Sequence, residues 1–114
     1  MPVRSLSLSV FKWPERHEII AAFREWAEKT SVARPELKNA GYFGSYARSE
    51  EGVGSDLDVV LLVESSSLER MMRPTRWDLG SLPVPVDVVV FTEPEWHALP
   101  LNRMKRETVW IYER

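Results

Sequence analysis

The chain has no cysteine, and its 114 residues also include no glutamine and only two asparagines. The absence of cysteine excludes disulfide bonds and thiolate metal sites. No apolar run approaches the roughly 20 residues that a membrane-spanning helix needs. Residues 1–13 lack the basic-then-apolar layout of a signal peptide. We therefore expect a cytoplasmic protein that does not enter a membrane.

Strong positive charge is also missing, because the formal net charge is -2 and the sequence pI is about 5.7. Domains that bind nucleic acids through phosphate contacts are usually strongly basic, so direct nucleic-acid binding is not expected. The scarcity of amides, together with eight prolines and many Arg and Glu residues, favours a thermophilic source.

The length and composition predict one globular domain over residues 1–114. The chain is 44% hydrophobic and 28% charged, which is ordinary for such a domain. Residues 1–13 form an N-terminal arm or an edge strand in this interpretation. The alternation of serine with apolar residues over 5–10 favours the strand, while a loose arm stays open as the alternative.

Hydrophobic periodicity predicts a helix that begins at Pro14 and ends near Thr30, with Ile19, Phe23 and Trp26 on one face. The remaining patterns predict strands at 41–43, 56–63 and 84–91, a helical turn at 46–51, and helices at 68–72, with serine caps at 65–67, and at 93–99. Residues 107–112 are expected to form a last strand or a short apolar strap. The strands 56–63 and 84–91 are joined through a helix, so we expect them to be parallel neighbours. The order predicts an α/β fold.

Three carboxylates mark the beginnings of two apolar strands. Asp56 and Asp58 are two residues apart, so in a strand they point to the same face, and Asp87 has a similar place in the next strand. Parallel pairing would gather all three at one end of the sheet, where they repel one another unless they bind cations or protons. Carboxylate oxygens suit Mg²⁺ or Mn²⁺, and two such ions serve phosphoryl-type transfer.

A Gly44-Ser45 break precedes these carboxylates. Gly44 permits close backbone approach, and Ser45 offers a hydroxyl and an amide at the start of a helical turn, where an anion can bind. A nucleoside triphosphate could be held by Ser45 and by Mg²⁺ at Asp56 and Asp58, while Asp87 bridges one metal and accepts the proton of an attacking hydroxyl. Each piece alone is an ordinary turn or strand end, and only their combination indicates a metal–nucleotide site.

Gly44-Ser45, ten residues and then Asp56-x-Asp58 resembles the signature of the DNA polymerase beta-like nucleotidyltransferase superfamily. More closely, the stretch is similar to the minimal nucleotidyltransferase (MNT) family, with Asp87 as the third carboxylate. The resemblance implies an α/β (α+β) fold with a small mixed β-sheet flanked by helices, and two Mg²⁺ ions. It also implies transfer of a nucleoside monophosphate from a triphosphate to a hydroxyl.

Under the same resemblance, Gly44, Ser45, Arg48 and Ser55 are the nucleotide-binding candidates, and Asp56, Asp58 and Asp87 are the catalytic metal ligands. Arg48 could instead pair with Glu50 or Glu51. One departure is visible: the family usually has glycine after its Ala-Arg pair, where this chain has Ser49.

The MNT resemblance further implies an antitoxin that transfers AMP from ATP to a tyrosine of a HEPN-domain toxin. A non-catalytic antitoxin that neutralises its partner by complex formation is the alternative. Transfer to a small molecule such as an aminoglycoside is a third hypothesis, and no added acceptor domain is visible to support it. The acceptor surface is expected from a partner or from a second copy in a homo-oligomer.

Two further groups of residues allow more than one interpretation. Arg70, Arg73 and Arg76 form either a basic rim for a partner or phosphate, or a solvated helix face, which is the more common case. Trp26 is expected in the core. One or two of the other tryptophans are expected at an oligomer interface, where aromatic residues are enriched; these are Trp13, Trp77, Trp96 and Trp110.

Overall fold

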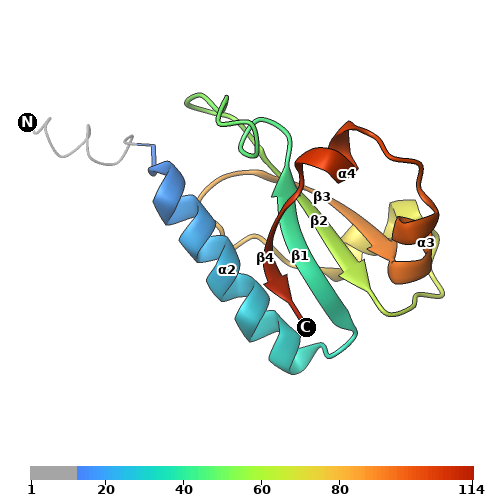
Figure 1. The fold of residues 1–114 in the computed structure, drawn as a ribbon. Coiled ribbons are helices and arrows are strands. Elements are labelled where there is room, and N and C mark those ends of the chain that lie inside the picture. The colour runs from blue at the N-terminus through green and yellow to red at the C-terminus, as the bar shows by residue number, and fades with distance from the viewer. Residues whose placement is uncertain (1–12) are drawn as a thin grey trace, which may run out of the picture.

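The computed structural model describes residues 13–114 (Figure 1). Its elements are the helix α2 (Arg16–Ala33), the strands β1 (Leu37–Phe43) and β2 (Leu57–Val63), the 3-10 helix η1 (Arg70–Arg76), the strand β3 (Val86–Thr92), the helices α3 (Glu93–Ala98) and α4 (Arg103–Glu107), and the strand β4 (Val109–Glu113). The strand or arm predicted for residues 1–13 falls almost entirely outside the described residues. Over residues 13–114, no helix has the length and apolar character that crossing a membrane would require.

The four strands form one mixed sheet in the order β3-β2-β1-β4. The strands β2 and β3 are parallel, as predicted, while β1 is antiparallel to both β2 and β4. Helices flank this sheet, so the α/β fold with a small mixed sheet is confirmed (Figure 1).

Alternate residues of β2 enter two different cores, because successive side chains of a strand point to opposite faces. Val59, Leu61 and Val63 pack in the core that contains the apolar face of α2, whereas Val60 and Leu62 pack with residues of β3 and α3 on the other face. All five side chains are buried, which confirms a strand covered on both sides.

The same alternation places the two strand carboxylates. Asp58 precedes Val60 by two residues, and Asp87 precedes Val89 by two; Val60 and Val89 both belong to the second core. Asp58 and Asp87 therefore lie on the sheet face that carries α3 and α4, opposite to α2. The packing of the strands thus determines which helices lie beside these acids.

Several element boundaries differ from the prediction. The helix α2 begins at Arg16, because Glu15 and Glu18 form a capping box there, and it continues to Ala33. The strand β1 begins at Leu37, four residues before the predicted start at Gly41, because Leu37 is buried and pairs with β2. The polar Lys38-Asn39 pair hides this extension from a hydrophobicity pattern.

The segments beside α4 and η1 also differ. The helix expected at 68–72 is displaced and is a 3-10 helix: η1 begins at Arg70, inside the predicted range, and continues through Pro74 to Arg76. The helix α4 was not predicted, and the final strand begins at Val109 because the preceding residues are helical. By contrast, β3 begins directly after Pro85, as expected because proline has no amide proton to donate to the hydrogen bonds between strands.

The position of η1 is explained by Arg73, whose side chain is buried. Its Nε donates to the carbonyl of Leu68 at 2.9 Å, and its Nη1 donates to the carbonyl of Val90 at 3.2 Å. Its Nη1 and Nη2 also donate to the two carboxylate oxygens of Glu95, at 2.6 and 3.1 Å. Arg73 is therefore part of neither a basic rim nor a solvated face, and both of those interpretations are wrong for it.

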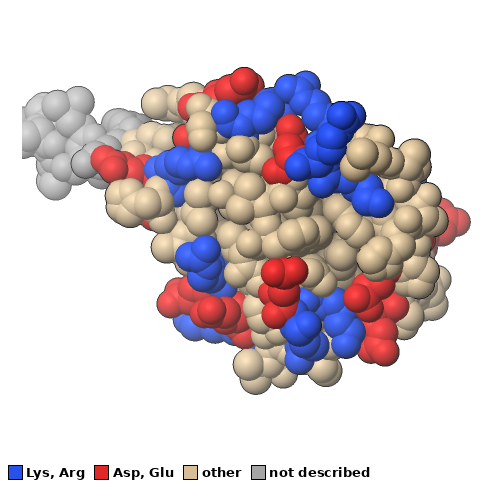
Figure 2. All heavy atoms as spheres, in the orientation of Figure 1, with Lys and Arg blue, Asp and Glu red and all other residues tan. Residues whose placement is uncertain are grey.

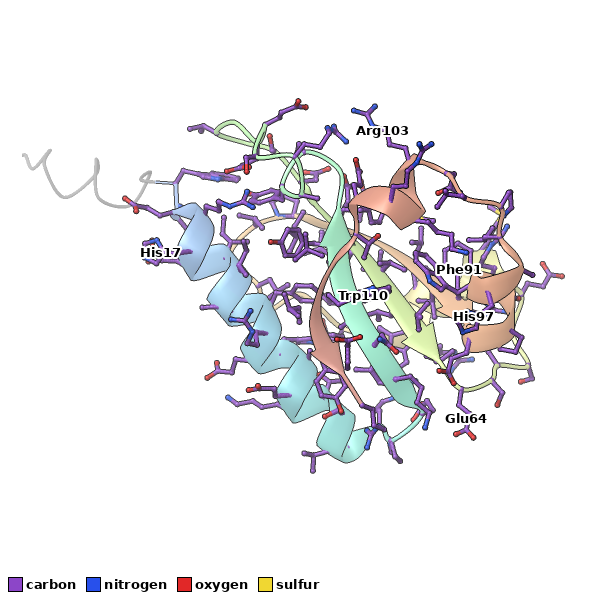
Figure 3. All side chains as sticks on the ribbon, in the orientation of Figure 1. His17, Glu64, Phe91, His97, Arg103 and Trp110 are labelled. Carbon is purple, nitrogen blue, oxygen red and sulfur yellow. The ribbon has the colours of Figure 1, made fainter. Side chains whose placement is uncertain are left out.

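The tryptophans are mostly internal. Trp26 is in the core, as predicted, but Trp77 and Trp96 are buried there as well. Trp96 packs against Phe91 and Trp110 on the α3 side of the sheet, with ring centroids 5.7 and 5.5 Å apart (Figure 3). The expected use of aromatic residues at an oligomer interface does not apply to Trp77 or Trp96, because their own domain buries them.

The Arg73–Glu95 pair leads to a stability prediction. We expect Glu95→Gln to lower the free energy of unfolding by about 2 kcal/mol at pH 7, because the buried guanidinium loses its counter-charge. The hydrogen bonds from Arg73, followed by the bond from the Thr92 amide, lower the pKa of Glu95 to about 2 from 4.5. The stabilisation is therefore complete above pH 4.5 and is lost as the pH falls toward 2.

Urea unfolding of both proteins across this pH range measures the difference. Glu93→Gln, in the first turn of the same helix, is the matched control and should cost less than about 1 kcal/mol. Equal destabilisation by the two substitutions, or a difference that does not change with pH, would contradict the prediction.

Candidate active site

Two carboxylates of the candidate site come from neighbouring parallel strands. Asp58 of β2 is in register with Asp87 of β3, and Asp56 immediately precedes β2. Burial raises the pKa of Asp58, and the charges of Asp87 and Asp56 raise it further. The structure thus brings these three acids to one end of the sheet, close enough for their charges to act on one another.

The chemistry of this donor set fits a hard divalent cation. All three groups are carboxylates, the ligands that Mg²⁺ and Mn²⁺ prefer, and their mutual repulsion is the condition that a cation relieves. As the side chains lie, no three Asp, Glu or His residues within 13–114 converge on a single ion position. Asp56 and Asp87 are exposed, so rotation about their side-chain bonds can bring their oxygens together. Neither histidine takes part, since His17 is on the outside of α2 and His97 is on α3 (Figure 3).

The Gly44 turn lies directly against Asp58. Gly44 has a φ of +71°, and a Cβ atom at this position would collide with Oδ2 of Asp58. The chain then makes a helical turn, in which the amide of Arg48 donates to the carbonyl of Gly44 at 3.1 Å. Ser45 lies at the start of this turn, and the turn begins two residues earlier than predicted.

Arg48 is held by two carboxylates. Its Nε donates to Glu50 at 2.9 Å, and its Nη1 donates to the two oxygens of Glu107 at 3.0 and 3.1 Å. Glu50 was one of the two expected alternatives; the other, Glu51, pairs instead with Arg16 at 2.7 Å. The bonds to Glu50, followed by those to Glu107, raise the pKa of Arg48, so its charge is secure.

Glu107 is the residue of this region that sequence reasoning missed. Its Oε2 accepts the Gly44 amide proton at 2.6 Å, in addition to the bonds from Arg48. The close approach of the C-terminal segment depends on Gly41, where a Cβ atom would lie 2.7 Å from the Trp110 ring and 2.8 Å from the Val109 carbonyl. The sequence contains one indication of this contact: a strand or short strap is predicted for the C-terminal segment, and a strand would bring that segment to the sheet.

Ser55 has a local structural contact. Its hydroxyl accepts the amide proton of Gly52 at 2.9 Å, and its own amide donates to the Gly52 carbonyl at 3.1 Å. Ser55 therefore closes the loop that leads to Asp56, and contact of its side chain with a nucleotide stays a prediction.

Basic side chains lie on one side of the three acids. Figure 2 shows Lys and Arg side chains gathered over α4 and the 44–56 loop. The basic residues of these two segments are Arg48, Arg103, Lys105 and Arg106. Two residues of this basic border are paired with carboxylates, Arg48 with Glu50 and Glu107, and Arg103 with Glu107. The acids and the basic border together offer groups for both a cation and an anion, as a metal-bound polyphosphate requires.

A comparison with protein families identifies the group to which this arrangement belongs. The profile of the nucleotidyltransferase domain matches residues 24–111, more than half of the chain. The chain belongs to the nucleotidyltransferase domain family. The matched residues include every candidate site residue named above. The comparison with curated proteins finds no match.

Solved structures share the nucleotidyltransferase fold. A Sulfolobus solfataricus protein assigned as a nucleotidyltransferase aligns with a TM-score of 0.65 and 22% identity, over 87% of this chain and 84% of that one. A toxin–antitoxin crystal structure with AMP-PNP aligns with a TM-score of 0.53 and 18% identity, over 89% and 75% of the two chains. A mutant of the MntA-HpeT toxin–antitoxin pair with two Asp-to-Glu substitutions gives 0.50 and 16%, with the same coverage.

The departure from the MNT pattern at Ser49 has a structural consequence. Ser49 has a φ of +58°, a left-handed conformation that glycine adopts without strain. We expect Ser49→Gly to raise the free energy of unfolding by about 0.5–1 kcal/mol, because the relief of strain exceeds the added entropy of the unfolded chain. Ser81→Gly, at an exposed position without a positive φ, is the control and should be neutral or destabilising. A Ser49→Gly protein no more stable than wild type in urea would contradict this explanation.

Repulsion between the carboxylates leads to a second prediction. We expect Asp58→Asn to stabilise the metal-free protein at pH 7 by about 0.5–1 kcal/mol, because it removes a like-charge pair across two strands. The raised pKa of Asp58 means that ionisation of this group opposes folding, so the gain should vanish below pH 3.8, its ordinary value.

Thermal unfolding with and without Mg²⁺ completes this test. Mg²⁺ should raise the melting temperature of the wild type and of Asp78→Asn, which lies outside the site, but not that of Asp58→Asn. Equal Mg²⁺ stabilisation of all three proteins would show that the ion binds elsewhere.

Proposed function

We propose that the protein is a Mg²⁺-dependent nucleotidyltransferase that transfers AMP from ATP to a hydroxyl group. The observation that carries this proposal is the in-register pairing of Asp58 and Asp87 beside the Gly44 turn. Membership of the nucleotidyltransferase domain family supports transferase chemistry in general. The choice of ATP is supported by the related fold that was crystallised with AMP-PNP, an ATP analogue.

In this proposal Asp56, Asp58 and Asp87 hold two divalent ions. When bound, the ions neutralise the charge of the phosphates and of the attacking and leaving oxygens. The protein's own contribution is to keep three carboxylates at one end of two paired strands, with the backbone of Gly44 packed against one of them. This arrangement defines where the phosphates of the nucleotide must lie.

The triphosphate tail is assigned to the Gly44 turn and its basic border. Ser45 can donate its hydroxyl and its amide at the start of the turn, and Arg48 contributes a full positive charge. Ser45 is only partly buried, so a phosphate can reach it from solvent. These contacts orient the α-phosphorus toward the carboxylates.

Transfer then requires one bond to form and one to break. The acceptor oxygen forms a bond to the α-phosphorus, the bond from that phosphorus to pyrophosphate breaks, and pyrophosphate leaves. The proton of the acceptor hydroxyl passes to the carboxylate of Asp87, which is exposed and can therefore meet an incoming acceptor.

The acceptor in this proposal is a tyrosine of a HEPN-domain toxin, and the protein acts as its antitoxin. Two toxin–antitoxin structures with the same fold support a toxin as the partner. The described residues form one sheet, its helices and the loops between them, and in this proposal the acceptor tyrosine lies on the partner protein.

The test is transfer of label from α-labelled ATP to the protein encoded by the neighbouring gene, which we expect to contain a HEPN domain. We expect Mg²⁺-dependent labelling of a tyrosine by the wild type and a loss of at least about 100-fold in rate for Asp58→Asn, because charge neutralisation of this kind contributes several kcal/mol. Asp78→Asn makes the same change outside the site and should keep the wild-type rate.

A non-catalytic antitoxin gives the opposite pattern. If the protein acts by complex formation alone, Asp56→Ala with Asp58→Ala should still protect cells from the toxin, and no label should appear on it. Equal labelling by wild type and Asp58→Asn would contradict the assigned site directly.

A further inference from the structure

Glu107 connects the C-terminal segment to both parts of the triphosphate site. It is the last residue of α4, yet its carboxylate contacts Gly44 and Arg48, about sixty residues earlier in the chain. Resting on the nucleotidyltransferase function proposed above, we infer that Glu107 is a positioning residue, which orients Arg48 and the Gly44 turn for the triphosphate without touching the reacting atoms.

The first part of the evidence is the contact with the Gly44 turn. The amide of Gly44 donates to Glu107, while the Cα side of the same residue is packed against Asp58. The turn is therefore fixed from two directions, by a carboxylate of α4 and by a carboxylate of β2. Both contacts are made by the residue immediately before Ser45.

The second part is the geometry of Arg48. The Nη1 of Arg48 donates to Glu107 and its Nε donates to Glu50, so two of the three nitrogens of the guanidinium group are occupied. Within residues 13–114, its Nη2 makes no hydrogen bond. The side chain of Glu107 is 14% exposed, compared with 63% for Glu50. The less exposed contact is the more rigid of the two, so Glu107 holds the guanidinium with Nη2 free to donate to a phosphate.

The third part is charge. Burial alone would raise the pKa of Glu107, but the hydrogen bonds from the Gly44 amide and from Arg48 outweigh it, and the pKa is lowered. Arg103 adds a weaker contact, 3.5 Å from the same carboxylate, at the outer side of α4 (Figure 3). Glu107 is therefore ionised at neutral pH and acts as a permanent counter-charge for Arg48.

The contrasting role is competition, in which Glu107 accepts the hydrogen bonds of Arg48 and the Gly44 amide that the triphosphate would otherwise accept. The two roles predict opposite effects of Glu107→Gln. The glutamine oxygen still accepts from the Gly44 amide, whereas the counter-charge for Arg48 is lost. A positioning residue loses function in this variant, while a competitor gains affinity for the nucleotide.

The experiment is a double-mutant cycle of Glu107→Gln and Arg48→Ala in the labelling assay. With Mg²⁺ and ATP varied, we expect Glu107→Gln to raise KM for ATP by about ten-fold, the usual effect of one charge-assisted hydrogen bond, with a smaller change in kcat. In the Arg48→Ala background the same substitution should change KM by less than about two-fold, because the two residues act as one unit. Glu113→Gln, the same substitution on β4, should match the wild type.

Three results would overturn the positioning role. One is an unchanged KM in Glu107→Gln, another is a lower KM, which indicates competition, and the third is the full effect of Glu107→Gln in the Arg48→Ala background. Circular dichroism of each variant confirms that the measured proteins are folded. Absence of transfer by the wild type would instead refute the proposed function, so the two failures are distinguishable.

Discussion

The structure of the site depends on one steric constraint: the carboxylate of Asp58 occupies the space where residue 44 would have a Cβ atom. Because of this contact, the backbone turn that begins at Gly44 and the strand that carries Asp58 form one unit. The parallel register of β2 and β3 then adds Asp87 to that unit. The turn to which we assign the phosphates and the pair of acids to which we assign the metal ions are thus joined by backbone and strand contacts. No long side chain is needed between them.

This arrangement concentrates charge that does not favour folding. Asp58 is crowded by two acids of its own sign, while Arg48 and Glu107 form a compensating pair on the other side of the Gly44 turn. The stability of the domain comes from elsewhere, from the two apolar cores on either side of β2 and from the Arg73–Glu95 pair. The separation explains how the site can keep repelling carboxylates: the cores hold the strands in register whether or not a cation is present.

Local patterns in the sequence were enough to predict the parts of the structure that depend on nearby residues. The parallel pairing of β2 and β3, the burial of β2 on both faces and the meeting of Asp58 with Asp87 all follow from strand periodicity and chain order. The parts that failed depend on distant contacts. The bounds of η1 and the burial of Arg73 could not be predicted, because this burial requires Glu95, which lies on another element, and a row of arginines usually faces water.

Glu107 shows the same limit at the site itself. Its role requires that Gly41 admit the segment of Trp110 against β1, and neither residue carries a motif that links it to Gly44. A motif consists of residues at a short and constant spacing. The contact between Glu107 and Gly44, by contrast, depends on the pairing of β4 with β1. It follows that the candidate site extends beyond the stretch from Gly44 to Asp58, because Glu107 of α4, which directly precedes β4 in the chain, accepts the hydrogen bonds of Arg48.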